Sequence, residues 1–145
     1  MSEQSAASVR VSRHFTQAPE RVFDAWLDPV KAGKFLFATP TGEMVRAEIE
    51  PRVGGEFCFV DRRDGEDVEH FGNYVEIDRP RRLVFDFAVS TMPDSKTRVT
   101  IDIRPVASGC ELTLLQEGVL PDYADRTRDG WATILEALAA ALARG

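Results

Sequence analysis

Hydrophobic and polar residues alternate along the middle of this chain, from about residue 44 to residue 118. A period of two is typical of strands that bury one face. Turn-forming residues divide the region, most clearly the pair Asp64-Gly65, which favours a tight β-hairpin. Because the connections are short, we expect an antiparallel sheet. Its strands are predicted at about 44–50, 55–62, 67–77, 82–90, 96–105 and 110–118.

The two ends of the chain show other periods. Residues 9–15 alternate and predict a first strand, whereas residues 19–28 and about 30–37 predict two short helices that Pro29 separates. The last segment repeats apolar residues at helical spacing and predicts one long helix. Its apolar stripe consists of Trp131, Ile134, Leu135, Leu138 and Leu142.

The strands predict a sheet with one apolar and one polar face. In residues 82–90, for example, Leu83, Phe85 and Phe87 share a face opposite Asp86. Such a sheet needs a cover, and the C-terminal helix is the one long amphipathic segment of the sequence. A single helix of about 10 Å diameter is too narrow to cover six or seven strands. We therefore expect an α+β fold in which a curved antiparallel sheet surrounds the helix and leaves an apolar cavity.

Composition and charge narrow the class of protein. A chain of 145 residues fits a single domain, here residues 9–145 after a flexible tail of residues 1–8. The net charge of −6 argues against nucleic-acid binding. We expect no membrane span, a cytoplasmic location, and a monomer or homodimer. The sequence contains no HExxH, phosphate-binding loop or dinucleotide fingerprint, so no metal or cofactor is expected.

Four segments resemble one known family. They are PERVFDAWLDP, GGEF at 54–57, GNYVEIDRPRRLVFDF at 72–87 and DGWATILEAL near the end. In order and spacing the chain is similar to the START-like, helix-grip superfamily, in the branch named for the activator of heat-shock-protein-90 ATPase. The resemblance covers about residues 9–142. It implies a helix-grip fold with two short helices between strands 1 and 2, and a cavity that binds hydrophobic molecules. The chaperone activators that named the branch carry a further N-terminal domain, for which we expect no room here.

Strand alternation then proposes residues for the cavity wall. Two of them, Asn73 and Gln116, are polar and are expected either to bond a neighbouring group or to orient the polar end of a ligand. Gly130 in the last helix is expected to permit a close backbone contact. The predicted lining comprises Trp26, Phe35, Phe37, Phe57, Phe59, Phe71, Asn73, Phe85, Phe87, Gln116, Trp131 and Leu135.

Acid–base chemistry has three candidate groups, His70, Tyr74 and Asp86. Alternation places His70 and Tyr74 on the outer face unless a bulge reverses their strand. The series Asp61, Asp64, Asp67 and His70 is interpreted as a solvated hairpin, because it lacks the pattern of a metal site.

Three functions remain open at this stage. The leading hypothesis is the binding of a small hydrophobic molecule by a carrier, sensor or sequestering protein. The first alternative is an enzyme, for example a cyclase, that acts on such a molecule. The second alternative is a co-chaperone-like interaction module, which an exposed apolar patch would favour. We expect binding rather than catalysis.

Overall fold

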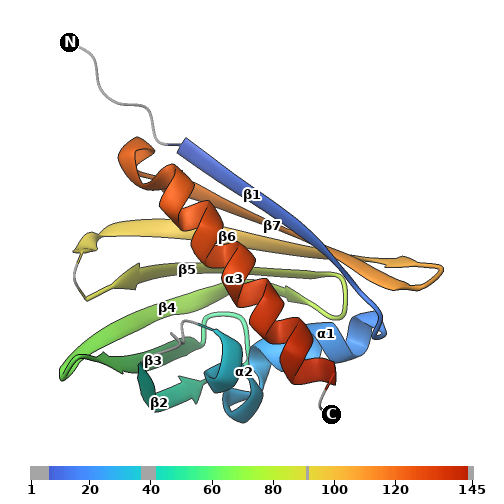
Figure 1. Ribbon diagram of the computed structural model, residues 1–145, viewed down its shortest axis with the longest axis horizontal. Helices are drawn as coiled ribbons and strands as arrows, with labels where there is room; N and C mark the ends of the chain where they lie inside the picture. Colours follow the sequence, from blue (N-terminus) through green and yellow to red (C-terminus); the bar gives the residue numbers. More distant parts are fainter. Residues whose placement is uncertain (1–6, 37–41, 91, 144–145) are drawn as a thin grey trace.

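The computed structural model describes residues 7–36, 42–90 and 92–143 (Figure 1). It confirms the α+β helix-grip fold, with two short helices between the first two strands and a long helix at the end. In chain order the elements are β1 (Ala7–Phe15), α1 (Pro19–Leu27), α2 (Pro29–Phe35), β2 (Glu43–Ile49), β3 (Glu56–Arg63), β4 (Glu66–Asp78), β5 (Arg82–Val89), β6 (Met92–Val106), β7 (Gly109–Val119), a 3₁₀ turn at Pro121–Tyr123 and α3 (Ala124–Ala143).

The seven strands form one antiparallel sheet in the order β1-β7-β6-β5-β4-β3-β2. Strands that follow one another from β2 to β7 are neighbours, as the short connections predicted. Asp64 and Gly65 turn the β3–β4 hairpin with φ of 52° and 80°. Two consecutive residues with positive φ match the twist of the flanking strands, which explains why this pair makes a tight turn.

Helices α1 and α2 meet at the Asp28-Pro29 pair. Proline is favoured at the first helical position, and the Asp28 carboxylate accepts a 2.9 Å hydrogen bond from the backbone N–H of Val30. The carboxylate caps α2 because it satisfies an N–H that has no partner within the helix. The resulting bent pair packs at the C-terminal end of α3 (Figure 1).

Helix α3 crosses the inner face of the curved sheet diagonally (Figure 1). Its buried residues are Trp131, Leu135, Leu138 and Leu142, which form most of the predicted stripe. They pack against inward side chains of the sheet, such as Phe85 and Ile101. The core therefore lies between α3 and the sheet, as the alternation of the strands predicted.

The expected N-terminal tail falls mostly outside the described residues. Ala7 and Ser8 belong to β1 and pair with β7. Among the described helices, none is long and apolar enough to cross a membrane.

Candidate ligand-binding site

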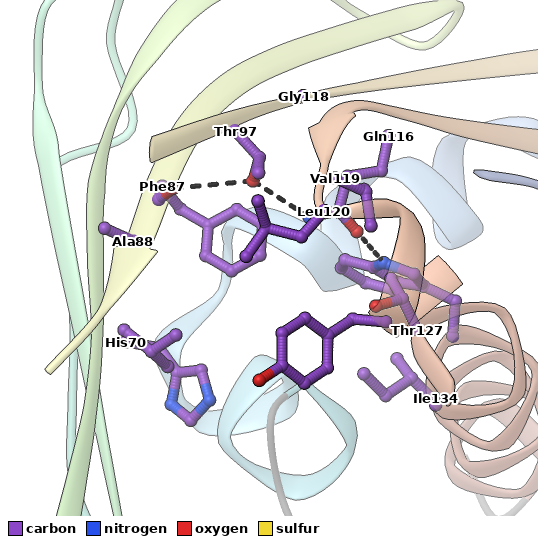
Figure 2. Close-up of a pocket in the computed structure, with 14 residues that line it drawn as sticks. His70, Phe87, Ala88, Thr97, Gln116, Gly118, Val119, Leu120, Thr127 and Ile134 are labelled. Atoms are coloured by element: carbon purple, nitrogen blue, oxygen red, sulfur yellow. Dashed lines mark hydrogen bonds between the residues drawn. The ribbon is translucent and has the colours of Figure 1, made fainter. Parts of the chain in front are cut away.

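A cavity of about 230 Å³ lies between the N-terminal half of α3 and the sheet (Figure 2). The sheet contributes His70 from β4, Phe87 from β5, Thr97 from β6 and Gln116 from β7. The opposite wall comes from the end of β7, the 3₁₀ turn and the first turns of α3. It is formed by Val119, Leu120, Tyr123, Thr127, Gly130, Trp131 and Ile134.

The wall of this cavity is mainly apolar and aromatic. Phe87 and Trp131 contact each other edge to face, with ring centroids 6.4 Å apart. Leu120 and Tyr123 are two of the exposed large hydrophobic residues of the described chain, and they border the cavity. A concave apolar site with a few convergent polar groups is typical of small-molecule binding. An engineered apolar cavity of about 150 Å³ binds benzene, so the volume here suits a molecule of at least one ring.

A chain of hydrogen bonds closes one end of the cavity (Figure 2). The Nε1 of Trp131 donates to the Oε1 of Gln116 at 2.5 Å, and the Nε2 of Gln116 donates to the Oγ1 of Thr97 at 2.8 Å. Thr97 in turn donates to the backbone carbonyl of Phe87 at 3.5 Å. Of the two roles open to Gln116, the structure shows hydrogen bonding to neighbouring side chains.

His70 lies at the other end of the cavity and is 7% exposed. Burial lowers the pKa of its imidazole to about 4, and the nearby positive charge of Arg63 lowers it further. A hydrogen bond with the Phe59 backbone and the negative charge of Asp61 act in the opposite direction and raise the pKa. The dominant cause is desolvation, which disfavours the charged form. His70 is therefore a neutral imidazole at pH 7.

The placement of His70 corrects the predicted faces of β4. It pairs with Phe59 of β3 and Val89 of β5, and directly paired residues share a face, so it points inward. Phe71 pairs with the outward Cys58, and Asn73 pairs with Glu56, so both point away from the cavity. The expectation that Phe71 and Asn73 face inward was wrong.

An irregularity in β4 explains the error. The register with β5 shifts between Tyr74 and Glu76, so Val75 is an extra residue in the strand. Tyr74 is buried in the core before the shift, and Ile77 packs on the same core after it. The inward side chains therefore change from even-numbered positions, such as Tyr74, to odd-numbered positions, such as Ile77. A single alternation that puts Phe71 and Val75 on one inner face does not hold across this shift.

Asp61 also proves to be buried rather than part of a solvated hairpin. It is 0% exposed, and its Oδ2 accepts a 2.7 Å hydrogen bond from the Nε of Arg63, whose side chain is 36% exposed. Both residues lie on β3 near His70. Among the described residues, no group of three or more acidic, histidine or cysteine side chains is arranged to hold a metal ion.

Most of the predicted aromatic lining packs solidly beside the cavity. Trp26 contacts Phe35 edge to face at 5.2 Å and also contacts Trp131. Where Trp26 faces Phe57, Phe59 and Phe85, only about 10 Å³ of space remains. The predicted residues that belong to the packed core are Trp26, Phe35, Phe57, Phe59, Phe85 and Leu135. Phe87, Gln116 and Trp131 line the cavity, and Phe37 lies outside the described residues.

Gly130 has the opposite role to the one expected. A Cβ built on it would meet no atom of the described residues within 4 Å, so their backbone does not approach it closely. Instead it lines the cavity. The spacing of Thr127, Gly130, Trp131 and Ile134 is i, i+3, i+4 and i+7, which places them on one helix face. At the N-terminal end of this stripe the residues are small, Thr127 and Gly130. Small residues on a core-facing helix stripe are the feature of the sequence that could have indicated a cavity here.

The other two acid–base candidates do not reach the cavity wall. Tyr74 is buried in the aromatic core, where desolvation raises the pKa of its hydroxyl. Asp86 points outward and binds Arg98 through both carboxylate oxygens, at 2.8 and 3.2 Å. His70 alone of the three lines the cavity.

Phe71 and Asn73 border a wider groove on the outer face of the sheet. Its volume is about 840 Å³, larger than that of the inner cavity. Its wall, however, is largely charged, with Arg46, Glu48, Glu50, Glu56, Glu69 and Lys96. A small apolar molecule gains little from such a surface, so the inner cavity is the better candidate site.

Comparisons with known proteins agree with this architecture. The fold is similar to a crystal structure from Chromobacterium violaceum, with a TM-score of 0.80 and 26% identity over 92% of this chain and 95% of the other. A Rhizobium loti protein gives a TM-score of 0.77 and 26% identity over 94% and 96% of the two chains. The solution structure of an AHSA1-like protein from Aeromonas hydrophila gives a TM-score of 0.83 over 95% and 93%; at 18% identity it shows the fold alone.

The sequence itself carries the family assignment. No curated protein matches the chain. The family model described as "Activator of Hsp90 ATPase homolog 1-like protein" matches residues 17–143, which include α1, α3 and every strand except β1. The chain therefore belongs to the family of activator of Hsp90 ATPase homolog 1-like proteins.

Proposed function

We propose that this protein binds a small hydrophobic molecule in the cavity between α3 and the sheet, as a carrier, sensor or sequestering protein. One observation carries the proposal: the helix stripe changes from the large buried residues Trp131 and Leu135 to the smaller Thr127 and Gly130, which border open space instead of filling it. The exposed apolar side chains of Leu120 and Tyr123 at the border give a ligand a favourable surface on entry.

The first experiment is a screen of lipids and aromatic metabolites by thermal shift and native mass spectrometry. A ligand that binds the folded state alone stabilises it by about 2.7 kcal/mol at 100 times its dissociation constant. We expect a positive shift for ring-containing molecules and a bound mass of one ligand per chain. If no member of the panel binds, the proposal is wrong.

A cavity-filling variant locates the binding site. Gly130→Leu adds a side chain on the cavity wall, where a Cβ meets no atom within 4 Å. It also replaces a helical glycine, so the helix itself is not weakened. We expect at least a tenfold loss of affinity. The matched control is Ala132→Leu, which adds the same side chain at an exposed position of α3 and should bind as the parent does. Equal affinity of the Gly130→Leu protein would contradict the assignment of the site.

General acid–base catalysis is a second candidate function, favoured by the presence of His70 in the cavity wall. A general base works best when its pKa lies near the operating pH. With a pKa of about 4, His70 is a weak base at pH 7, which favours binding over catalysis. Catalysis would become the preferred function if the protein converts a bound ligand and the His70→Gln variant loses this turnover but still binds the ligand.

A further inference from the structure

The polar groups of the cavity lie at two ends that differ in what they offer a ligand. At one end Gln116 uses its oxygen for Trp131 and its amide N–H for Thr97, and Thr97 donates onward to the Phe87 carbonyl. These groups hold α3 against β6 and β7. A ligand that bonded to them would have to break bonds that the protein already makes, and this costs about as much as it gains.

The other end is formed by His70, which faces the cavity from β4. Its imidazole is neutral at pH 7. The charges nearest to it belong to Asp61 and Arg63 of β3, which bind each other at 2.7 Å and so largely cancel. This end of the cavity is polar but presents no net charge.

A neutral polar end selects the chemistry of the ligand. A carboxylate or an ammonium group would lose its hydration on entering, and none of the described residues in the cavity wall carries an opposite charge to compensate it. A hydroxyl group loses much less, and it can donate a hydrogen bond to the acceptor nitrogen of a neutral imidazole whose N–H binds the Phe59 backbone. The apolar body of the ligand would then lie against Phe87, Trp131 and Ile134.

We infer that the ligand is an uncharged aromatic molecule with one hydroxyl group, bound with its ring against the wall formed by Phe87 and Trp131 and its hydroxyl at His70. This inference rests on the proposed function, since it names the class of molecule for the same cavity. His70 is a specificity-determining residue, and the Gln116 network is a structural support.

Three probes that share the ethylbenzene skeleton test the inference at pH 7: ethylbenzene, 4-ethylphenol and 4-ethylbenzoate. Binding is followed by NMR through the indole N–H signal of Trp131, which is identified with Trp131→Phe. Ethylbenzene reports on the apolar cavity alone. We expect 4-ethylphenol to bind about tenfold more tightly than ethylbenzene, as one additional hydrogen bond allows. We expect 4-ethylbenzoate to bind more weakly than ethylbenzene.

Variants at position 70 assign the selectivity. His70→Leu should abolish the preference for the phenol and leave ethylbenzene bound at least as tightly, whereas His70→Gln should retain part of the preference. Asp86→Asn on the outer face is the control and should leave all three affinities unchanged. Circular dichroism shows whether each variant is folded, and the ethylbenzene affinity shows whether its cavity is intact.

The outcomes separate this inference from the proposed function. If ethylbenzene binds as well as 4-ethylphenol, if the carboxylate binds best, or if the phenol preference survives in His70→Leu, the inference is wrong and the proposed function stands. If none of the three probes shifts the Trp131 signal, the inference is wrong; the proposed function is overturned as well only if no member of the lipid and aromatic-metabolite panel binds.

Discussion

The indole Nε1 of Trp131 donates a 2.5 Å hydrogen bond to the side-chain oxygen of Gln116. This bond joins the buried face of α3 to β7 at one end of the cavity. Both side chains are almost completely buried, at 3% and 5% exposure, so this bond satisfies an indole N–H and an amide oxygen that are shielded from water. The tryptophan at the head of the apolar stripe therefore serves both as a wall of the cavity and as an anchor for the helix.

Loss of this anchor should destabilise the fold. Gln116→Leu removes the acceptor for Trp131 and the donor to Thr97, and a buried polar group left without a partner costs about 1–3 kcal/mol. Urea unfolding measures the loss. In a double-mutant cycle with Trp131→Phe, the two changes should not be additive, because they remove the same bond. Additive effects would show that the hydrogen bond does not contribute to stability.

Gly130→Ala should stabilise the protein. Alanine is favoured over glycine in a helix by about 0.5–1 kcal/mol, and a Cβ at this position meets no atom within 4 Å. Gly72→Ala is the contrasting variant, because its Cβ would overlap the backbone carbonyl of Asp86 on the adjacent strand. We expect thermal unfolding at a higher temperature for the first and at a much lower temperature for the second. A destabilised Gly130→Ala protein would indicate that the space under the helix is filled.

The stability of the protein should rise between about pH 4 and pH 6.5 through His70. Its pKa is about 4 in the folded state and about 6.5 in the unfolded chain, so the unfolded state binds more protons in this window. The contribution is fully present above pH 6.5 and is lost as the pH falls toward 4. The difference amounts to roughly 3 kcal/mol.

Two variants isolate this contribution. His70→Phe should have a flatter pH profile than the parent over the same window, while carboxylates titrate alike in both proteins. The sequence contains two histidines, and the other, His14, is exposed and bonds Ser108 at 2.9 Å. His14→Gln, which removes a histidine outside the cavity, is the matched control. Denaturant midpoints at several pH values measure all three, and a steep profile that persists in His70→Phe would refute the assignment.

Two neighbouring arginines of β3 should differ in their effect on stability. Arg63→Met removes a 2.7 Å bond to the buried Asp61 and should cost about 1–3 kcal/mol, since the carboxylate stays in the core without this counter-charge. Arg62→Met breaks an exposed pair with Asp67 and should cost at most about 1 kcal/mol. Chemical denaturation of the two variants measures the loss of unfolding free energy in each. Equal losses would show that burial of Asp61 has no energetic consequence.

Much of this fold could be predicted because it depends on local patterns. Residues 82–90 and 110–118 alternate regularly, so their inward side chains, such as Phe85 and Gln116, followed from a period of two. The long helix and its stripe followed in the same way from a period of 3.6. The Asp64-Gly65 turn needed nothing beyond the backbone preferences of its two residues.

Strand β4 and Gly130 show what only the tertiary structure decided. A bulge at Val75 changes the phase of β4, so the direction of His70 depends on its pairing with Phe59 and Val89 rather than on its own neighbours in sequence. Sequence alternation tells which way a side chain points, but whether space lies beyond it depends on the segments that pack there. The sequence by itself determined the sheet, the helix and the family. The cavity and its neutral histidine exist because residues far apart in the chain leave a volume that none of the described side chains fills.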